Sequence, residues 1–286
     1  MQLLSFEDAG RARLGVRRGE FVVDLALADP DLPDSWPEIF EQMLLSRVAE
    51  AVAAADDAAL RPFDAIAFLP PIPRPPKILA IGLNYHDHAE EVGLPIPEEL
   101  IVFPRTPLSF VGHKRPLIRP KASEQFDYEG ELVAVIGKAG RHIAEANALG
   151  HVVGYAVGND GSLRDFQFKT SQWMLGKTFD ASGSWGPYIV TQDEVAAGAG
   201  ERAIETRLND RVVQSGNTAD MIFSLSRQIA LLSQVMTLEP GDIILTGTPA
   251  GVGVSRKPQL WMKPGDRIQV EIAGIGRLEN PIEAER

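Results

Sequence analysis

The sequence predicts an α+β fold built on a mixed β-sheet or a β-roll, preceded by a small β-rich module. Short apolar runs of the strand type outnumber helical stretches after residue 76, which disfavours a doubly wound parallel fold. Residues 2–25 alternate short apolar runs with glycine and charge, as small antiparallel strands do. With 286 residues, 44% of them hydrophobic, the chain can bury a full core.

A small N-terminal α+β module is predicted for residues 1–70. After the strands of residues 2–25, residues 34–59 carry apolar side chains at helical intervals, which predicts a helix that packs rather than catalyses. Five prolines stand in the eight positions from 69 to 76. Proline fixes φ and cannot continue a helix or an interior strand, so we place the boundary here. Residues 71–286 form the second domain, which is expected to hold the functional site.

This second domain is predicted to contain mostly strands. Strands are expected at residues 77–82, 127–137, 151–160, 186–191, 205–209 and 267–272. Helices are expected at residues 83–93 and 218–238. Residues 104–120 are expected to be extended and residues 161–180 to form a polar, turn-rich connection.

Composition excludes several classes of protein. A net charge of -11 and a pI near 5.0 disfavour nucleic-acid binding, which needs a clustered basic surface. The chain has no cysteine, so any metal must be held by oxygen or histidine. No stretch approaches the length of an apolar membrane span, and the first residues lack the pattern of a signal peptide. These features predict a cytoplasmic protein that does not bind membranes.

Three carboxylates stand at the ends of two apolar strands. Glu129 and Glu131 are two apart at the start of one strand and would share a face, and Asp160 ends the next. Like charges at the edge of a core are costly unless a cation offsets them, and oxygen ligands suit Mg²⁺ or Mn²⁺. The alternatives are a solvated strand end for the glutamates and an ordinary turn at Asp160.

Two histidine–carboxylate pairs lie on the predicted helix at residues 83–93. His88 and Glu91 are three apart, and His86 and Glu90 are four apart, so either pair could form an oriented base. Spacing alone does not choose between them, and both could be solvated surface pairs.

Two further segments bear on ligand binding. Lys177 follows Gly176 in an apolar and aromatic neighbourhood and could neutralise an anionic substrate, although most lysines lie at the surface. Residues 246–253 could offer backbone N–H groups to an anion, but they lack the patterns of a P-loop or a dinucleotide site. The chain also lacks a G-x-S-x-G motif, so a serine triad is not supported.

Five motifs in register resemble the fumarylacetoacetate hydrolase family. They are Asn84-Tyr85-x-x-His88-x-x-Glu91, Asp127-Tyr-Glu-Gly-Glu131, Gly158-Asn-Asp160 with Arg164-Asp165, Gly176-Lys177-Thr-Phe-Asp180, and Met236 to Gly253. The resemblance spans residues 77–272 and implies a mixed β-roll fold and a homodimer.

The resemblance also implies roles for individual residues. It places Mg²⁺ or Mn²⁺ on Glu129, Glu131 and Asp160. It assigns His88 and Glu91 as the catalytic pair in a lid-like helix and Lys177 as the active-site lysine. Tyr85, Arg164 and Thr248 are implied substrate-binding residues. Where many members have a larger residue after the aspartate, this chain has Gly161, which is expected to loosen the loop beside the metal.

The function implied is metal-dependent hydrolysis of a C–C bond in an acylpyruvate or 2,4-diketo acid. His88 would activate water, the bond would break to leave a metal-stabilised enolate, and Lys177 would offset the negative charge. The same enolate forms in a decarboxylase or a keto–enol isomerase acting on a related oxo-acid such as oxaloacetate. From a different class, the carboxylates could form the cation site of a non-catalytic ligand-binding protein.

Overall fold

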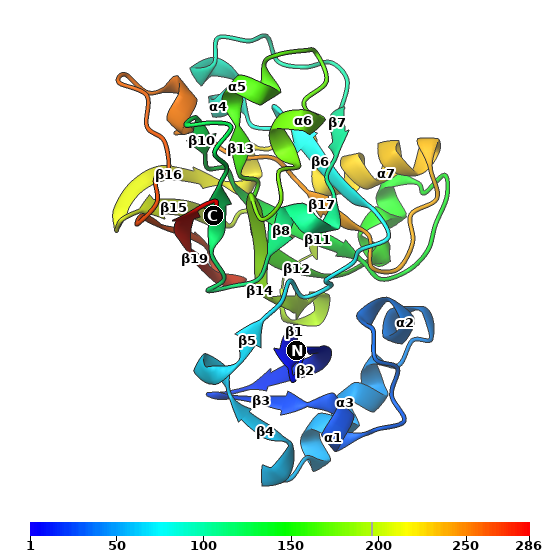
Figure 1. Cartoon of the computed structure of the whole chain (residues 1–286). Helices are drawn as coiled ribbons and strands as arrows, with labels where there is room; N and C mark the ends of the chain where they lie inside the picture. Colours follow the sequence, from blue (N-terminus) through cyan, green and yellow to red (C-terminus); the bar gives the residue numbers. More distant parts are fainter. Residues whose placement is uncertain (196) are drawn as a thin grey trace.

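The computed structural model of the chain describes residues 1–195 and 197–286. A mixed twelve-stranded sheet runs through both the N-terminal and the C-terminal part of the chain (Figure 1). Its main path is β4 (Leu60–Pro62), β3 (Phe21–Asp24), β2 (Arg11–Arg18), β1 (Gln2–Asp8), β14 (Gly183–Thr191), β12 (Val152–Asn159), β11 (Gly130–Ile136), β17 (Ile243–Leu245), β6 (Ile78–Gly82) and β7 (Ile101–Pro104). Off this path, β5 (Ala67–Phe68) pairs with β1, and β8 (Phe110–Val111) pairs with β14.

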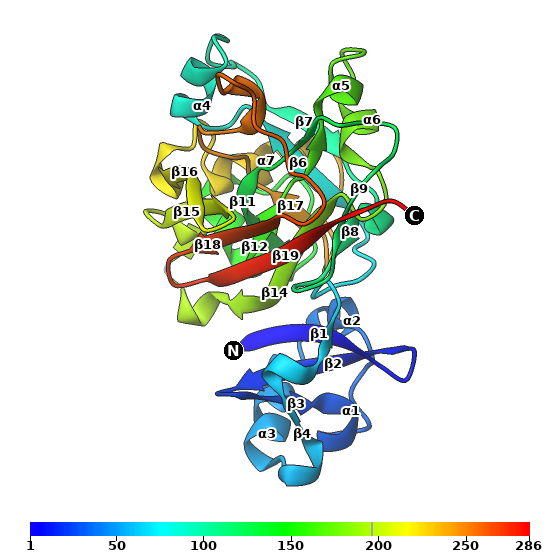
Figure 2. The same ribbon diagram turned by 60° about the vertical axis from the view of Figure 1, so that its left-hand side comes forward.

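A second, five-stranded sheet packs across the first, as Figure 2 shows for β18 and β19. Its order is β16 (Arg211–Asn217), β15 (Ala203–Leu208), β18 (Arg267–Ile272), β19 (Gly276–Ala284) and β9 (Leu117–Arg119). Leu132 and Tyr155 of the large sheet share a buried core with Ile204 and Val270 of this sheet. A short ladder joins β10 (Phe126–Asp127) to β13 (Ser162–Leu163). The predicted α+β fold with a mixed β-roll is confirmed.

The helices are short and lie at the margins of the sheets. The α-helices are α1 (Leu25–Ala28), α2 (Trp36–Glu41), α3 (Leu45–Ala54), α4 (His86–Glu91), α5 (Arg164–Gln167), α6 (Met174–Lys177) and α7 (Leu225–Val235). The 3₁₀ helices are η1 (Asp57–Ala59), η2 (Phe63–Ala65), η3 (Pro107–Ser109), η4 (Glu145–His151), η5 (Gln192–Glu194), η6 (Ala197–Ala199), η7 (Thr218–Asp220) and η8 (Gly253–Ser255). None of the helices described is both long and apolar enough to cross a membrane.

Two predicted helices are shorter in the structure than the sequence pattern indicated. The single helix predicted over residues 34–59 is wrong: it is divided into α2 and α3 because Met43 adopts a left-handed φ of 55°, which a right-handed helix cannot include. The helix predicted over residues 218–238 begins only at Leu225, where the Ser224 hydroxyl accepts a hydrogen bond from the N–H of Arg227. Helical periodicity located both segments but not their ends.

The N-terminal strands and helices form a lobe that is joined to the rest by β1 and β14 (Figure 1). Leu3 of β1 pairs with Ile189 of β14, and the indole N–H of buried Trp36 donates to the carbonyl of Leu4 at 3.1 Å. Leu3 and Trp36 share one apolar cluster with residues beyond the proline-rich segment, among them Ile189 and Val133. The division into residues 1–70 and 71–286 stays a prediction.

Three short helices lie together at one end of the large sheet and position the candidate site. Figure 1 shows α4, α5 and α6 gathered at the end opposite the N-terminal lobe. Helix α4 follows β6, and α5 and α6 follow β12 and β13. The polar connection predicted over residues 161–180 therefore contains one short strand and two single-turn helices.

Candidate metal centre

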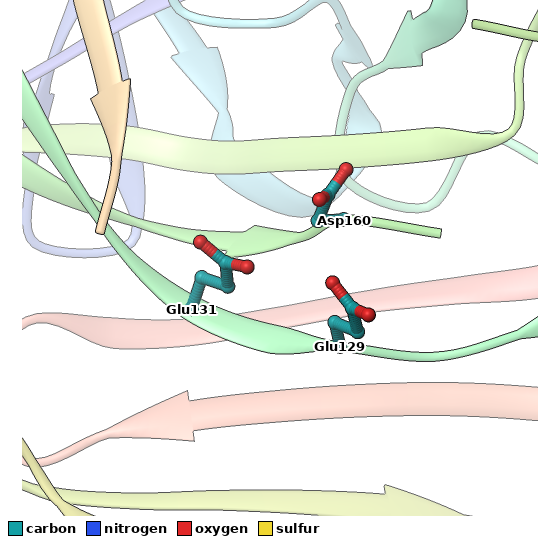
Figure 3. A group of neighbouring side chains, drawn as sticks. All are labelled: Glu129, Glu131 and Asp160. Atoms are coloured by element: carbon teal, nitrogen blue, oxygen red, sulfur yellow. The ribbon is translucent and has the colours of Figure 1, made fainter. Parts of the chain in front are cut away.

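Glu129, Glu131 and Asp160 form a compact group of carboxylates (Figure 3). One oxygen from each lies within 4.8 Å of the others. The antiparallel pairing of β11 with β12 brings them together, because Gly130 pairs with Asn159 between the acidic positions. Their exposed fractions are 6%, 1% and 0%, so the alternative of a solvated strand end is wrong.

Three cations offset two of these carboxylates. The ammonium of Lys177, itself only 1% exposed, lies 2.6 Å from Oε2 of Glu129 and 2.7 Å from Oδ2 of Asp160. Arg164 contacts Oε1 of Glu129 at 2.7 Å, and Arg105 pairs with Oδ1 of Asp160. These pairs place a positive charge beside each of the two buried carboxylates.

Glu131 has a different environment. It accepts a hydrogen bond from the backbone N–H of Gly247 at 2.8 Å, and no ion pair to it occurs among the described residues. Burial, together with the negative charges of Asp160 and Glu129, raises the pKa of Glu131 well above its usual range. Burial also opposes ionisation of Glu129, but Lys177 and Arg164 outweigh it and hold the pKa of Glu129 below its usual range.

This group of residues fits a hard divalent cation. All the side-chain donors are carboxylate oxygens, which Mg²⁺ and Mn²⁺ prefer. Glu131 is a buried acid beside two others and has no ion-pair partner among the residues that the structure describes, so an added positive charge would relieve the repulsion between these acids. The residues present therefore match the metal that the sequence predicted.

His88 and Glu91 contact each other on helix α4. Nδ1 of His88 lies 3.2 Å from Oε2 of Glu91, while Oε1 of Glu91 accepts a hydrogen bond from the N–H of Gly251 at 2.9 Å. The carboxylate thus orients the imidazole and leaves Nε2 as its available nitrogen. Of the rival pair, His86 and Glu90 are exposed and line a separate surface hollow.

A cavity of about 250 Å³ is lined by His88 together with Glu129 and Glu131. Its polar lining is His88, Glu129, Glu131, Arg164, Gln167, Lys177 and Thr248. Its apolar lining is Ile81, Leu83, Val92, Leu94, Phe103, Phe168, Trp173 and Val254. A small anion could therefore contact the charged side while the opposite wall excludes water.

Arg164 and Thr248 are held rigidly at this cavity. Nε of Arg164 donates to Asp127 at 2.8 Å, and Nη2 of Arg164 is buried without a hydrogen-bond partner among the described residues. The hydroxyl of Thr248 donates to the carbonyl of Gly130 at 2.9 Å and accepts from Gln214 at 2.8 Å. Both residues line the cavity, and their predicted contacts with substrate stay predictions.

Tyr85, in contrast, is not among the residues that line the cavity. Its side chain is fully buried, and its hydroxyl has no hydrogen-bond partner among the described residues. Burial and the nearby charge of Glu131 raise the pKa of Tyr85. The structure thus places Tyr85 near Glu131 but outside the cavity lining, and its predicted contact with substrate stays a prediction.

Sequence reasoning missed three residues of this site. Arg105 forms an ion pair with Asp160. Gln167 lines the cavity and accepts a hydrogen bond from Arg164. Trp173 belongs to the apolar wall and packs on Phe103 with ring centroids 5.6 Å apart. The one available signal was Arg105 itself, a charge in an otherwise apolar, proline-containing segment. Gln167 and Trp173 carry no spacing that points to a site.

Gly161 has a clear packing role. A Cβ at this position would lie 1.9 Å from the carbonyl oxygen of Ser182, so only glycine allows the backbone after Asp160 to approach so closely. Gly161 was expected to loosen the loop beside the metal, but the structure shows that the backbone there is tightly packed.

Comparisons with known proteins extend these observations. The sequence model described as fumarylacetoacetate hydrolase C-terminal matches residues 77–283. A mitochondrial oxaloacetate tautomerase of Homo sapiens is 42% identical over 266 residues, covering 92% of this chain and 84% of that protein. A mitochondrial oxaloacetate tautomerase of Xenopus laevis is 42% identical over 289 residues, covering 99% and 90%.

Solved structures agree over the full length. Fumarylacetoacetate hydrolase from Exiguobacterium antarcticum has a TM-score of 0.84 and 36% identity, with 100% of each chain covered. Maleylpyruvate hydrolase from Sphingobium, solved with manganese(II) and pyruvate, has a TM-score of 0.83 and 28% identity, again with 100% of each chain covered. The matched region includes the carboxylates, His88 and Lys177. This chain belongs to the fumarylacetoacetate hydrolase family.

Proposed function

We propose that this protein is a metal-dependent keto–enol tautomerase of oxaloacetate or a closely related 2-oxo acid. The observation that carries the proposal is the 42% identity, over nearly the whole chain, to two proteins named oxaloacetate tautomerases. The cavity supports it, because its cationic and carboxylate side suits a small oxo-acid. This moves the emphasis from hydrolysis, the first expectation from the sequence, to the isomerase alternative.

Glu129, Glu131 and Asp160 would hold Mg²⁺ or Mn²⁺ through carboxylate oxygens. When bound, such an ion polarises a 2-oxo group and lowers the energy of negative charge on its oxygen. Lys177 and Arg164 keep Glu129 ionised for this task by offsetting its charge.

His88 is the proposed base. In the keto-to-enol direction its Nε2 takes a proton from C3 of the substrate, and the electrons of that C–H bond form the C2=C3 double bond. The C2 oxygen gains a proton in the same conversion, so the substrate is isomerised without net change. Glu91 stabilises the imidazolium through Nδ1, at 3.2 Å.

Lys177 and Arg164 bind and position the substrate in this proposal. Arg164 lines the cavity and its guanidinium is positively charged, so it is suited to a substrate carboxylate. The Lys177 ammonium, which lies 2.6 Å from Glu129 and 2.7 Å from Asp160, would donate a proton to the C2 oxygen. The proton taken by His88 then leaves to solvent and Lys177 regains one, which restores both groups. Thr248 adds a hydroxyl to the cavity wall.

Hydrolytic C–C cleavage of an acylpyruvate is the second candidate. It is favoured by the structural similarity to two hydrolases, one of them solved with pyruvate. In that reaction His88 would take a proton from water, and the products would be pyruvate and a carboxylic acid. The same residues would serve both reactions, since His88 accepts a proton in each and only the donor differs, C3 of the substrate in one and water in the other.

The test is a tautomerisation assay started with enol oxaloacetate and followed by the loss of enol absorbance. We expect catalysis above the spontaneous rate, loss of it with EDTA, and recovery with Mg²⁺ or Mn²⁺. Product analysis separates the alternatives: a decarboxylase releases CO₂ and pyruvate, and a hydrolase converts acylpyruvates. Absence of turnover on all these substrates, with metal still bound, would favour the non-catalytic binding protein. The homodimer and the cytoplasmic location stay predictions.

A further inference from the structure

Each carboxylate of the acidic group has one oxygen engaged by a donor that the fold fixes in place. Arg105 binds Oδ1 of Asp160, Arg164 binds Oε1 of Glu129 at 2.7 Å, and the N–H of Gly247 binds Oε2 of Glu131 at 2.8 Å. The second oxygens of Glu129 and Asp160 both contact the Lys177 ammonium, at 2.6 and 2.7 Å, so a positive charge already lies between these two acids. Arg105 differs from Arg164 because it is absent from the cavity lining.

Arg105 is itself immobilised on every side. Its Nε donates to the hydroxyl of Ser109 at 3.2 Å, its Nη1 also donates to the carbonyl of Gly161 at 3.2 Å, and its Nη2 donates to the hydroxyl of Ser182 at 2.9 Å. The guanidinium lies 4.3 Å from the centre of the Phe110 ring. Its side chain is fully buried, so this charge contacts no solvent and no ligand.

The surrounding backbone is shaped to admit this side chain. A Cβ on Gly183 would lie 2.8 Å from Nη2 of Arg105, so a larger residue there would displace the guanidinium. Burying an arginine is costly unless its donors are paired, and here each nitrogen has a partner. One of these partners is Asp160, a predicted metal ligand, so the position of Arg105 also affects the orientation of that carboxylate.

We propose that Arg105 is a positioning residue for the metal centre: it holds Oδ1 of Asp160 and thereby presents Oδ2, the oxygen that also contacts Lys177, to the cation. The inference rests on the proposed metal site. Partners of this kind orient a ligand carboxylate, and their loss typically weakens metal affinity by about 10 to 100-fold. Arginine suits the task because its planar fork spans several acceptors, whereas the lysine ammonium is a point charge.

The experiment measures Mn²⁺ affinity by calorimetry and the EPR spectrum of the bound ion in Arg105→Gln and Arg105→Lys. Arg105→Gln is expected to weaken Mn²⁺ binding by about 10 to 100-fold and to change the spectrum. Arg105→Lys retains the charge and is expected to recover part of the affinity, remaining about 3 to 10-fold below wild type. Arg13→Gln is the matched control, because Arg13 pairs at 2.8 Å with another fully buried aspartate, Asp24, in the N-terminal lobe.

The outcomes distinguish this inference from the proposed function. Wild-type affinity and spectrum in a folded Arg105→Gln would overturn it, as would an equal loss in Arg13→Gln. If Arg105→Gln does not fold, Arg105→Lys decides, since unchanged affinity and spectrum there would contradict positioning by the fork. Failure of the wild-type protein to bind Mn²⁺ would instead overturn the metal site itself.

Discussion

Glu91 and Gly251 are joined by a hydrogen bond of 2.9 Å from the backbone N–H to Oε1. The other oxygen of Glu91 contacts Nδ1 of His88. The loop that contains Gly251 also presents the N–H of Gly247 to Glu131, at 2.8 Å. One loop therefore sets both the orientation of the proposed base and that of a proposed metal ligand.

The first prediction concerns His88 as a base rather than a ligand. His88→Ala should lower kcat by about 10² to 10⁴ while leaving Mn²⁺ affinity near wild type. Glu91→Gln should lower kcat by less, because glutamine still offers an acceptor to Gly251 but no charge to the imidazolium. Steady-state kinetics with parallel calorimetry provides the measurement.

The control for this prediction is the neighbouring histidine. His86→Ala should leave kcat and Mn²⁺ affinity near wild type, since His86 is exposed and lies outside the cavity lining. The double variant of His88 and Glu91 should be little worse than His88→Ala alone, as for two groups acting as a unit. An active His88→Ala enzyme with a large loss in His86→Ala would show that the wrong histidine had been assigned.

The second prediction is that substitutions in the acidic group weaken metal binding, but that one of them stabilises the metal-free protein. Glu129→Gln, Glu131→Gln and Asp160→Asn should each weaken Mn²⁺ binding by about 100-fold or more, because each removes an anionic ligand. In EDTA, however, Glu131→Gln should raise the free energy of unfolding by about 1 to 3 kcal/mol, since Glu131 is a buried acid with no ion-pair partner among the described residues.

Glu129→Gln is the matched control for the stability effect. It leaves Lys177 and Arg164 with one buried anionic partner fewer, so it should lower the unfolding free energy in the same urea titrations. Equal stability changes in the two variants would contradict the difference in environment that the structure assigns to Glu129 and Glu131.

The third prediction concerns a truncated chain that begins at Lys77. Removing the first 76 residues uncovers Ile189 and the edge of β14, where β1 now pairs, so the fragment should unfold at lower urea concentration and associate more readily than the full chain. Mn²⁺ binding should survive in whatever fraction folds, because the acidic group lies wholly within residues 77–286. Calorimetry with Mn²⁺ on the fragment after gel filtration checks this. A folded fragment that does not bind Mn²⁺ would contradict the domain boundary predicted at residues 69–76.

The fourth prediction is a pH dependence of stability from His113. Burial lowers the pKa of His113 to about 4, and its Nδ1 accepts the N–H of Glu279 at 3.1 Å, a bond that protonation would remove. An unfolded histidine titrates near 6.5, so the unfolded chain binds more protons between these values. The stability is therefore fully present above about pH 6.5 and should fall by on the order of 3 kcal/mol as the pH drops toward 4.

His113→Asn isolates this contribution, since the asparagine oxygen can still accept from Glu279. In urea titrations across that pH range, the free energy of unfolding of this variant should fall less steeply with decreasing pH than that of wild type. His142→Asn, at an exposed histidine, should keep the wild-type slope. The same slope in wild type and His113→Asn would assign the acid sensitivity to other groups.

Local pattern in the sequence was sufficient to locate most elements and the acidic group. Continuous apolar runs identified β11 and β12, and the acids at their ends identified the proposed metal ligands, because strand geometry fixes which side chains share a face. The break between α2 and α3 escaped prediction, since the left-handed φ occurs at Met43 and not at a glycine, the residue that usually signals such a conformation in a sequence.

Relations between distant segments were decided only by the tertiary structure. Spacing in the sequence did not distinguish His86 from His88 as the proposed base. The structure favours His88 because it lines the cavity, and because its partner Glu91 is held by Gly251, which lies 160 residues further along the chain. The different charge environments of Glu129 and Glu131 arise because Lys177 and Arg164 approach one acid and not the other. Arg105 became part of the site for the same reason: its partner Asp160 is 55 residues away, and sequence periodicity carries no information about contacts at that separation.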